Sequence, residues 1–131
     1  MNPTVWLSLQ AADAPALIDY FVGTFGFVLT ARHGDGDVVE HAELLWPEGS
    51  GGIMLGSHRP GALWSREPGS AGGYVVTADP AALYDRIAQR NADVVRPLAR
   101  TSYGAQEFAV RDPEGNLWSF GDYAGEPAPR R

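Results

Sequence analysis

The feature that most constrains the fold of this chain is an internal repeat. Residues 12–19 match residues 78–85 when the first segment is shifted by 66 positions. The positions that become identical are Ala12, Asp13, Ala16, Leu17 and Asp19. Two such periods span almost the whole chain of 131 residues. A repeat of this length predicts that one supersecondary unit occurs twice and fills the chain.

Each copy is predicted to contain a strand, a helix and three further strands. Asp13 and Asp79 are expected to be helix N-caps, because a carboxylate there accepts from the free N–H groups of the first turn. Pro80 suits the first position of a helix, and Gly26 suits a left-handed C-cap. The apolar helix stripes are Leu17, Ile18, Phe21, Val22 and Phe25 in the first copy, and Leu83, Tyr84, Ile87 and Ala88 in the second. Strands are predicted over 5–10, 27–31, 38–46, 53–56, 74–77, 93–96, 105–111 and 117–121, with turns over 33–37, 47–52 and 112–115.

This element order predicts an α+β fold made of two βαβββ modules. The modules are residues 1–56 and 73–123, joined by a linker or flap over 57–72 that is rich in Gly, Pro and Ser, and followed by a flexible tail over 124–131. A small sheet with one helix leaves its second face exposed. Two curved mixed sheets are therefore expected to surround a cleft, within one chain or across a homodimer, with the helices on the outer face. Such a cleft is a natural ligand site.

Composition excludes several classes of function. The chain has no cysteine, so it has no thiolate metal ligand and no cysteine nucleophile. A net charge of −6 disfavours nucleic acid as a partner and would attract a cationic ligand. No apolar run is long enough to span a membrane, and the first residues lack the features of a signal peptide. These observations predict a cytoplasmic protein with no nucleic-acid or membrane partner.

Two motifs give the chain a resemblance to a known family. The first is the duplicated βαβββ pattern, and the second is Asp112-Pro113-Glu114-Gly115-Asn116-Leu117-Trp118-Ser119-Phe120-Gly121. Together they resemble the vicinal oxygen chelate superfamily, which has the glyoxalase and bleomycin-resistance fold. The segments 41–44 and 54–57 add a similarity to an actinobacterial branch that includes antibiotic-binding self-resistance proteins. The resemblance implies a homodimer, either with or without strands exchanged between subunits.

Enzymes of this superfamily bind a divalent metal through His, Gln or Glu side chains on four strands. Carried over by the resemblance, the four positions fall on Trp6, on Met54 or Leu55, on Gly73 and on Ser119. None of these residue types is a sound ligand for a divalent first-row metal. The resemblance therefore implies the fold, while the ligand positions predict a protein without metal or other cofactor.

The remaining polar candidates have structural explanations. His41 and Glu43 share one face of a strand, since side chains alternate along it, and they are expected to form a surface ion pair or hydrogen bond. The carboxylates of Glu40, Glu43 and Glu107 are expected to be solvated or paired with an arginine such as Arg111. A carboxylate inside an apolar cavity would instead have a raised pKa and could act as a base.

The tryptophans and their polar neighbours define the predicted ligand site. By alternation, Trp6, Ser8 and Gln10 face the cleft from the first strand, and Ser119 faces it from the last, whereas Trp118 packs in the core. Trp46 is expected at the cleft rim, Met54 in its wall and Trp64 in the flap. Indole faces stabilise planar ligands by about 1 kcal/mol per good contact.

These residues predict a small-molecule binding protein without a catalytic residue. With the resemblance, the ligand class is an aromatic or peptide antibiotic or metabolite, held by sequestration as a form of self-resistance. Two alternatives stay open. One is a metal-dependent lyase, isomerase or dioxygenase of the same superfamily, and the other is an interaction module whose tryptophans form core or dimer contacts.

Overall fold

The computed structural model describes residues 2–130 and shows two four-stranded sheets with their helices. The first module contains β1 (Trp6–Ala11), α1 (Ala14–Tyr20), η1 (Phe21–Phe25), β2 (Val28–Asp35), β3 (Val38–Leu45) and β4 (Gly52–Ser57). The second contains β5 (Gly72–Val76), α2 (Pro80–Ala88), β6 (Asp93–Arg100), β7 (Gln106–Arg111) and β8 (Leu117–Gly121). The predicted α+β fold with two βαβββ units is confirmed. Within residues 2–130, no helix has the length and apolar character needed to cross a membrane.

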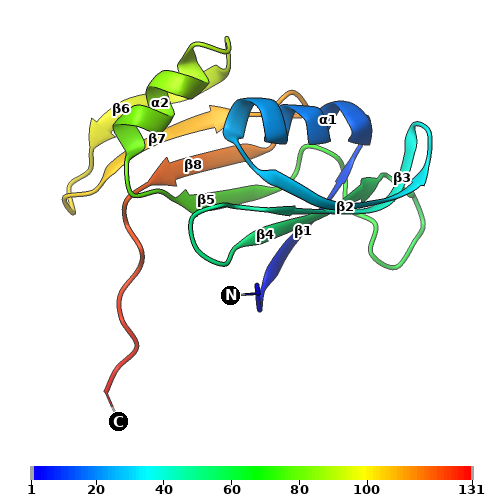
Figure 1. Cartoon of the computed structure of the whole chain (residues 1–131), viewed down its shortest axis with the longest axis horizontal. Coiled ribbons are helices and arrows are strands. Elements are labelled where there is room, and N and C mark those ends of the chain that lie inside the picture. Colours follow the sequence, from blue (N-terminus) through cyan, green and yellow to red (C-terminus); the bar gives the residue numbers. More distant parts are fainter. Residues whose placement is uncertain (1, 131) are drawn as a thin grey trace.

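The two sheets have the same topology. The strand orders are β1-β4-β3-β2 and β5-β8-β7-β6, with the first pair of each sheet parallel and the other pairs antiparallel. The helices of both modules lie on one side of the sheets (Figure 1). Each sheet therefore has a covered face, which packs on helices, and an opposite face that we call the open face.

The helix starts follow the predicted capping. Asp13 Oδ1 accepts a hydrogen bond from the Ala16 amide at 3.2 Å, and Asp79 Oδ1 accepts from Ala82 at 3.1 Å. In both helices a proline occupies one of the first two positions, where a missing N–H costs nothing. Gly26 has φ of 95° and ends the first helical segment, as expected for a left-handed C-cap.

The predicted stripe of the first helix is wrong at one position. Val22 is exposed and Thr24 is buried instead, because the segment Phe21–Phe25 is a π-helix. A π-turn holds more residues than an α-turn, so the buried face moves relative to an α-helical count. The register change keeps both Phe21 and Phe25 fully buried.

Two predicted strands are too short. The first hairpin was expected to turn over 33–37, but β2 continues to Asp35 and the turn lies at residues 36–37. This extension places the rings of His33 and His41 in a stack with centroids 6.3 Å apart. In the second module, β6 runs through Pro97 to Arg100. Pro97 is tolerated because β6 is an edge strand with an irregular register at that point.

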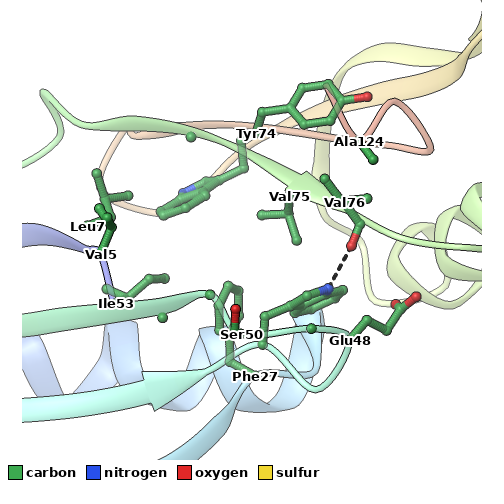
Figure 2. Close-up of a pocket in the computed structure, with 16 residues that line it drawn as sticks. Val5, Leu7, Phe27, Glu48, Ser50, Ile53, Tyr74, Val75, Val76 and Ala124 are labelled. Carbon is green, nitrogen blue, oxygen red and sulfur yellow. Dashed lines mark hydrogen bonds between the residues drawn. The ribbon is translucent and has the colours of Figure 1, made fainter. Parts of the chain in front are cut away.

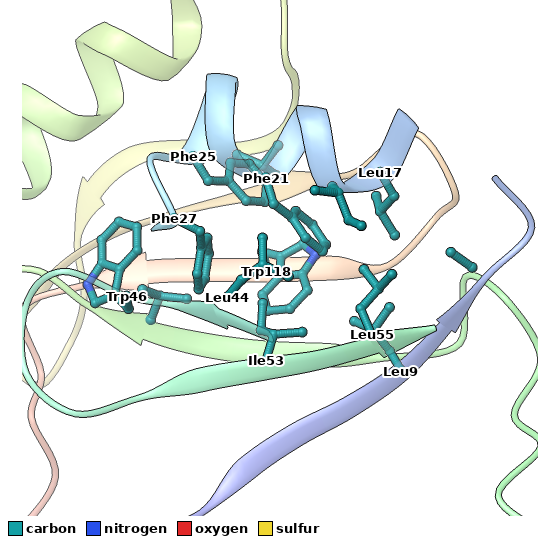
Figure 3. Packing of buried hydrophobic residues seen from close by; sticks show 14 of the residues in the cluster. Leu9, Leu17, Phe21, Phe25, Phe27, Leu44, Trp46, Ile53, Leu55 and Trp118 are labelled. Atoms are coloured by element: carbon teal, nitrogen blue, oxygen red, sulfur yellow. The ribbon is translucent and has the colours of Figure 1, made fainter. Parts of the chain in front are cut away.

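One aromatic core joins the modules on the covered side (Figure 3). Trp118, from the second sheet, contacts Phe21 and Phe27 of the first module at centroid distances of 5.3 and 6.4 Å. Phe25 contacts Phe120 at 4.9 Å. Asp112 accepts from the Trp118 indole N–H at 3.0 Å, so the buried ring has no unsatisfied polar atom. Trp118 is a core residue, as its strand position predicted.

Each module has one glutamate that binds backbone amides just before the helix of the other module. Glu114, in the β7–β8 turn, accepts from the Ala12 and Asp13 amides at 2.7 and 2.8 Å. Glu48, in the β3–β4 turn, accepts from the Ala78 amide at 2.8 Å. Both contacts obey the 66-residue repeat of the sequence, since Ala12 corresponds to Ala78 and Glu48 to Glu114. The modules are thus held together by a duplicated polar clamp as well as by the core.

We predict that the two clamps differ in strength. Glu114→Ala should lower the free energy of unfolding by about 1–3 kcal/mol, because two backbone amides lose a charged acceptor. Glu48→Ala, which removes one such bond, should cost about half as much. Urea unfolding of both variants measures the difference, with the exposed Glu67→Ala as the control. Equal stability of Glu114→Ala and the wild type would contradict a role for this contact.

Candidate functional site

The open face of the first sheet carries a cavity that contains most of the predicted site residues. Its volume is about 580 Å³, and we call it the indole cavity. It is lined by Trp6, Ser8, Leu9, Gln10, Glu40, His41, Met54, Leu55, Gly56, Ser57, Arg59, Ala62, Leu63 and Trp64. The structure therefore brings together Trp6, Ser8, Gln10, Met54 and Trp64. Two predicted members, Trp46 and Ser119, lie elsewhere.

The floor of the indole cavity is formed by β1 and β4, and strand alternation determines which of their side chains point into it. Leu9 packs in the core, so its neighbours Ser8 and Gln10 project from the open face. Met54 lies directly beside Ser8 in the parallel pairing of β1 and β4. The Trp6 ring lies over Gly52, so closely that a Cβ at residue 52 would overlap it. A glycine at this position is what allows the indole to lie flat along the sheet.

The wall of the indole cavity comes from the segment between the modules. Residues 58–71 contain no helix or strand, and Trp64 is 71% exposed within them. Gln10 Oε1 accepts from the Arg59 and Arg66 amides at 3.3 and 3.4 Å, so one side chain of the floor binds the loop on both sides of Trp64. Its amide nitrogen stays available for a ligand. The loop therefore presents an indole that nothing in the described chain buries.

Trp46 is in a different place from the predicted cleft rim. It is only 7% exposed, and its indole N–H donates to the Val76 carbonyl at 2.8 Å. Its ring contacts Phe27, with centroids 5.0 Å apart. Residue 46 directly follows the end of β3 at Leu45, and contacts with Phe27 and with Val76 of the second module cover its ring.

A second cavity lies between the two sheets, beside Trp46 (Figure 2). Its volume is about 510 Å³. Its apolar lining includes Val5, Leu7, Phe27, Ile53, Val75 and Trp118. The Trp46 indole N–H is already bonded, and Glu48 at the rim is engaged with Ala78, so the interior offers a guest little beyond apolar contact.

Ser119 lies on the open face of the second sheet rather than in the indole cavity. It pairs with Tyr74 of β5 and with Ala109 of β7. Its alternation with the buried Trp118 and Phe120 agrees with the predicted orientation. In a single chain, Ser119 therefore points away from the core. It lies on the second sheet, whereas Trp6 lies on the first.

The four positions inherited from metal-binding relatives do not fit a divalent metal. Gly73 packs toward Trp118 and Leu7 on the covered side, so the carried-over third position is one residue off. The residue of β5 that corresponds to Trp6 in the repeat is Gly72. Trp6, Met54, Gly72 and Ser119 provide no imidazole or carboxylate. Among residues 2–130, no group of three or more His, Asp or Glu side chains is arranged to hold a metal ion.

The two residues of β3 that were expected to interact on the open face do form a hydrogen bond with each other. His41 Nε2 and Glu43 Oε2 are 2.8 Å apart, both partly exposed, as the alternation predicted. Glu40 lies 3.8 Å from Arg59, an exposed ion pair at the cavity edge. Both pairs are therefore the partly exposed contacts that the strand pattern predicted.

The surroundings of Glu107 differ from those that the sequence predicted. It is buried, and its Oε2 accepts from the hydroxyls of Tyr74 at 2.7 Å and Tyr103 at 2.6 Å. The predicted partner Arg111 instead binds Asp93 at 3.3 Å. One signal was present in the sequence: Gly121 lies opposite Glu107, and the space left by its missing side chain is filled by the Tyr74 hydroxyl and the Glu107 chain.

This network changes the acidity of its phenols. Burial, and then the hydrogen bond to Glu107, raise the pKa of Tyr74 to about 12. For Tyr103, the hydrogen bond to Glu107 is the main cause of a raised pKa. Burial also raises the pKa of Tyr20 to about 12, with smaller contributions from Asp112 and Asp93. The phenols therefore act as hydrogen-bond donors at any physiological pH.

Comparison with known proteins agrees with this architecture. The duplicated βαβββ fold, with one open face on each sheet, defines the class as a two-module α+β protein. The family model described as Glyoxalase/Bleomycin resistance protein/Dioxygenase superfamily matches residues 4–120, and the chain belongs to this superfamily. A search of curated proteins finds no significant match.

Solved structures share the fold over nearly the whole chain. TioX from Micromonospora sp. ML1 is 26% identical, with a TM-score of 0.72, and the match covers 91% of this chain and 98% of TioX. A glyoxalase/bleomycin resistance protein from Streptomyces sp. CB03234 is 22% identical, with a TM-score of 0.75 and coverage of 93% and 100%. Virulence protein STM3117 from Salmonella typhimurium is 22% identical, with a TM-score of 0.70 and coverage of 95% and 98%.

We predict a delayed alkaline titration of Tyr74 and Tyr20. Tyr74 and Tyr20 have folded-state pKa values of about 12, against an ordinary value of 10.0. Since the fold favours their neutral form, this stabilisation is complete below about pH 10 and is lost as the pH rises through about 12. Absorbance at 295 nm should show Tyr74 and Tyr20 ionising last, and Tyr74→Phe should reduce the amplitude of this late step. Ionisation of all tyrosines together near pH 10 in the folded protein would contradict this assignment.

Proposed function

We propose that this protein binds an aromatic or peptide antibiotic or metabolite in the indole cavity and sequesters it without a metal. The observation that carries the proposal is the convergence of Trp6, Met54 and Trp64 on one cavity of about 580 Å³. Ligand sites are commonly of this size and combine apolar walls with a few polar groups. Here Ser8 and the free amide nitrogen of Gln10 provide polar contacts beside the two indoles.

The exposure of Trp64 supports this function. An indole that is 71% exposed leaves a large apolar surface in water, and covering it is favourable. Gln10 binds the loop at residues 59 and 66, on both sides of Trp64, so a bound ligand would not have to order the whole segment. A planar guest between Trp6 and Trp64 would gain about 1 kcal/mol per aromatic contact beyond burial.

The names of structural relatives support the ligand class only by analogy. The matching superfamily and the Streptomyces structure both include bleomycin resistance protein in their descriptions. We carry that description to this chain as part of the proposal, with self-resistance by sequestration as the role and the cytoplasm as the place where an incoming antibiotic would be bound.

We further propose that two chains form a homodimer that completes two equivalent clefts. In each cleft the first sheet of one chain would face the second sheet of its partner, so that Ser119 lies opposite the indole cavity. The open face of the second sheet supports this pairing because it exposes apolar area at Leu117 (48%) and Tyr74 (40%). The proposal holds whether or not strands are exchanged between the chains.

We predict that loss of either exposed indole weakens ligand binding. The measurement is a tryptophan-quenching screen of DNA-intercalating and glycopeptide antibiotics, followed by calorimetry with the best compound. Trp6→Ala and Trp64→Ala should each reduce the affinity about fivefold to tenfold, whereas Val22→Ala, on the helix side, should leave it unchanged. Absence of quenching by every compound, or a stoichiometric divalent metal retained by the protein through dialysis, would overturn the proposed function.

The dimer is tested separately by light scattering. The wild type should have twice the chain mass of 14.1 kDa at micromolar concentration. Leu117→Asp should raise the dissociation constant at least about tenfold, because a carboxylate would be buried unpaired at the interface. Val22→Asp should leave the dimer intact. A monomeric wild type over the whole concentration range would contradict this assembly.

A further inference from the structure

The open face of the second sheet has a chemistry different from that of the indole cavity. Glu107 is 6% exposed, yet among residues 2–130 no Arg or His nitrogen lies within 4.0 Å of its carboxylate. A buried carboxylate is costly unless a cation or several hydrogen bonds compensate it. Tyr74 and Tyr103 both donate to the same oxygen, Oε2, which leaves Oε1 for a further donor.

Three tyrosines are grouped beside this carboxylate. Tyr103 and Tyr123 contact edge to face, with ring centroids 5.4 Å apart, and both rings remain accessible to solvent at 61% and 39%. Tyr74 projects from the side of β5 opposite to Val75 (Figure 2), and its hydroxyl also accepts from the Tyr123 amide at 3.2 Å. Tyr74 and Tyr103 are therefore held by Glu107 itself, while Tyr123 is held against them and donates its own hydroxyl to Glu126 at 2.9 Å.

We propose that Glu107 with Tyr74, Tyr103 and Tyr123 forms a binding site for an organic cation, of the ammonium or quaternary ammonium class. A cation over an aromatic face is attracted by the ring quadrupole, and the attraction increases when the site is partly desolvated. The guest would supply the positive charge that the described chain does not place beside Glu107. The net charge of −6 would concentrate cations near the protein.

The repeat shows that this chemistry belongs to the second module alone. Glu107 corresponds to His41, 66 positions earlier, and Tyr74 corresponds to Ser8. The same two positions of the fold therefore carry a carboxylate and a phenol in one sheet, and an imidazole and a small hydroxyl in the other. In the proposed dimer, the cation site would face the partner's indole cavity, so the sequestered ligand would carry a cationic group beside its aromatic part. This last step rests on the proposed function, whereas the cation site itself does not.

The test uses choline and its neutral isostere 3,3-dimethylbutan-1-ol, with ring resonances of labelled tyrosine followed by NMR in the full chain. Choline should shift the resonances of Tyr103 and Tyr123, and the neutral alcohol should bind at least about tenfold more weakly. Glu107→Gln should lower the choline affinity about tenfold. Asp85→Asn, on the outer side of α2, makes the same change in net charge and should have no effect.

A second pair of variants keeps the test valid should Glu107→Gln fail to fold. Tyr103→Leu removes a ring and should weaken choline binding several-fold, whereas Tyr103→Phe keeps the ring and should retain most of it. Equal affinity for choline and its isostere, or equal effects of Glu107→Gln and Asp85→Asn, would overturn the site. Neither result bears on quenching of Trp6 and Trp64 by aromatic antibiotics, so failure of this site and failure of the proposed function are distinguishable.

Discussion

The packing of Trp118 between the two modules is the interaction on which the rest of the structure depends. Its ring is fully buried against Phe21 and Phe27, and its N–H is bonded to Asp112. A large aromatic side chain contributes several kcal/mol when it is buried in this way. Because the core is built on the covered faces, each sheet is stabilised from one side only. The side chains of the open faces are therefore not part of this core, and they can differ between the modules without loss of the fold.

The repeat and strand alternation were enough to predict the architecture and the floor of the site. Caps at Asp13 and Asp79 depend on local chemistry, and the placement of Trp6, Ser8 and Met54 follows from the period of a strand. The errors came from features that helix and strand periods do not contain. The π-turn after α1 is invisible to a helical count, so Val22 was assigned to the wrong side. Trp46 is covered by the second module, a contact between distant segments that the strand pattern does not encode.

Glu107 shows a different limit of sequence reasoning. Its strand position was correct, but its surroundings come from Tyr103 in a turn and from Tyr74 on β5, two strands away across the sheet. Arginines near a carboxylate in sequence suggested an ion pair, whereas the fold gives Arg111 to Asp93. Which charges are paired depends on register and on cross-strand neighbours. Burial of a charge is therefore the property that a sequence pattern predicts least well.

Duplication followed by divergence explains how one fold obtains two kinds of surface. A module that had to bury both faces could change only by compensated substitutions, since cores are close-packed. Here the covered faces keep the shared aromatic core and the duplicated glutamate clamps, while the open faces keep only their geometry. Position 6 is an indole and its repeat equivalent, Gly72, has no side chain at all. This difference between the two open faces would affect ligand selection only if both faces contacted the same ligand. Two identical apolar faces would select ligands by shape alone. A sheet lined by indoles opposed to one lined by phenols and a carboxylate would select by shape and by charge together.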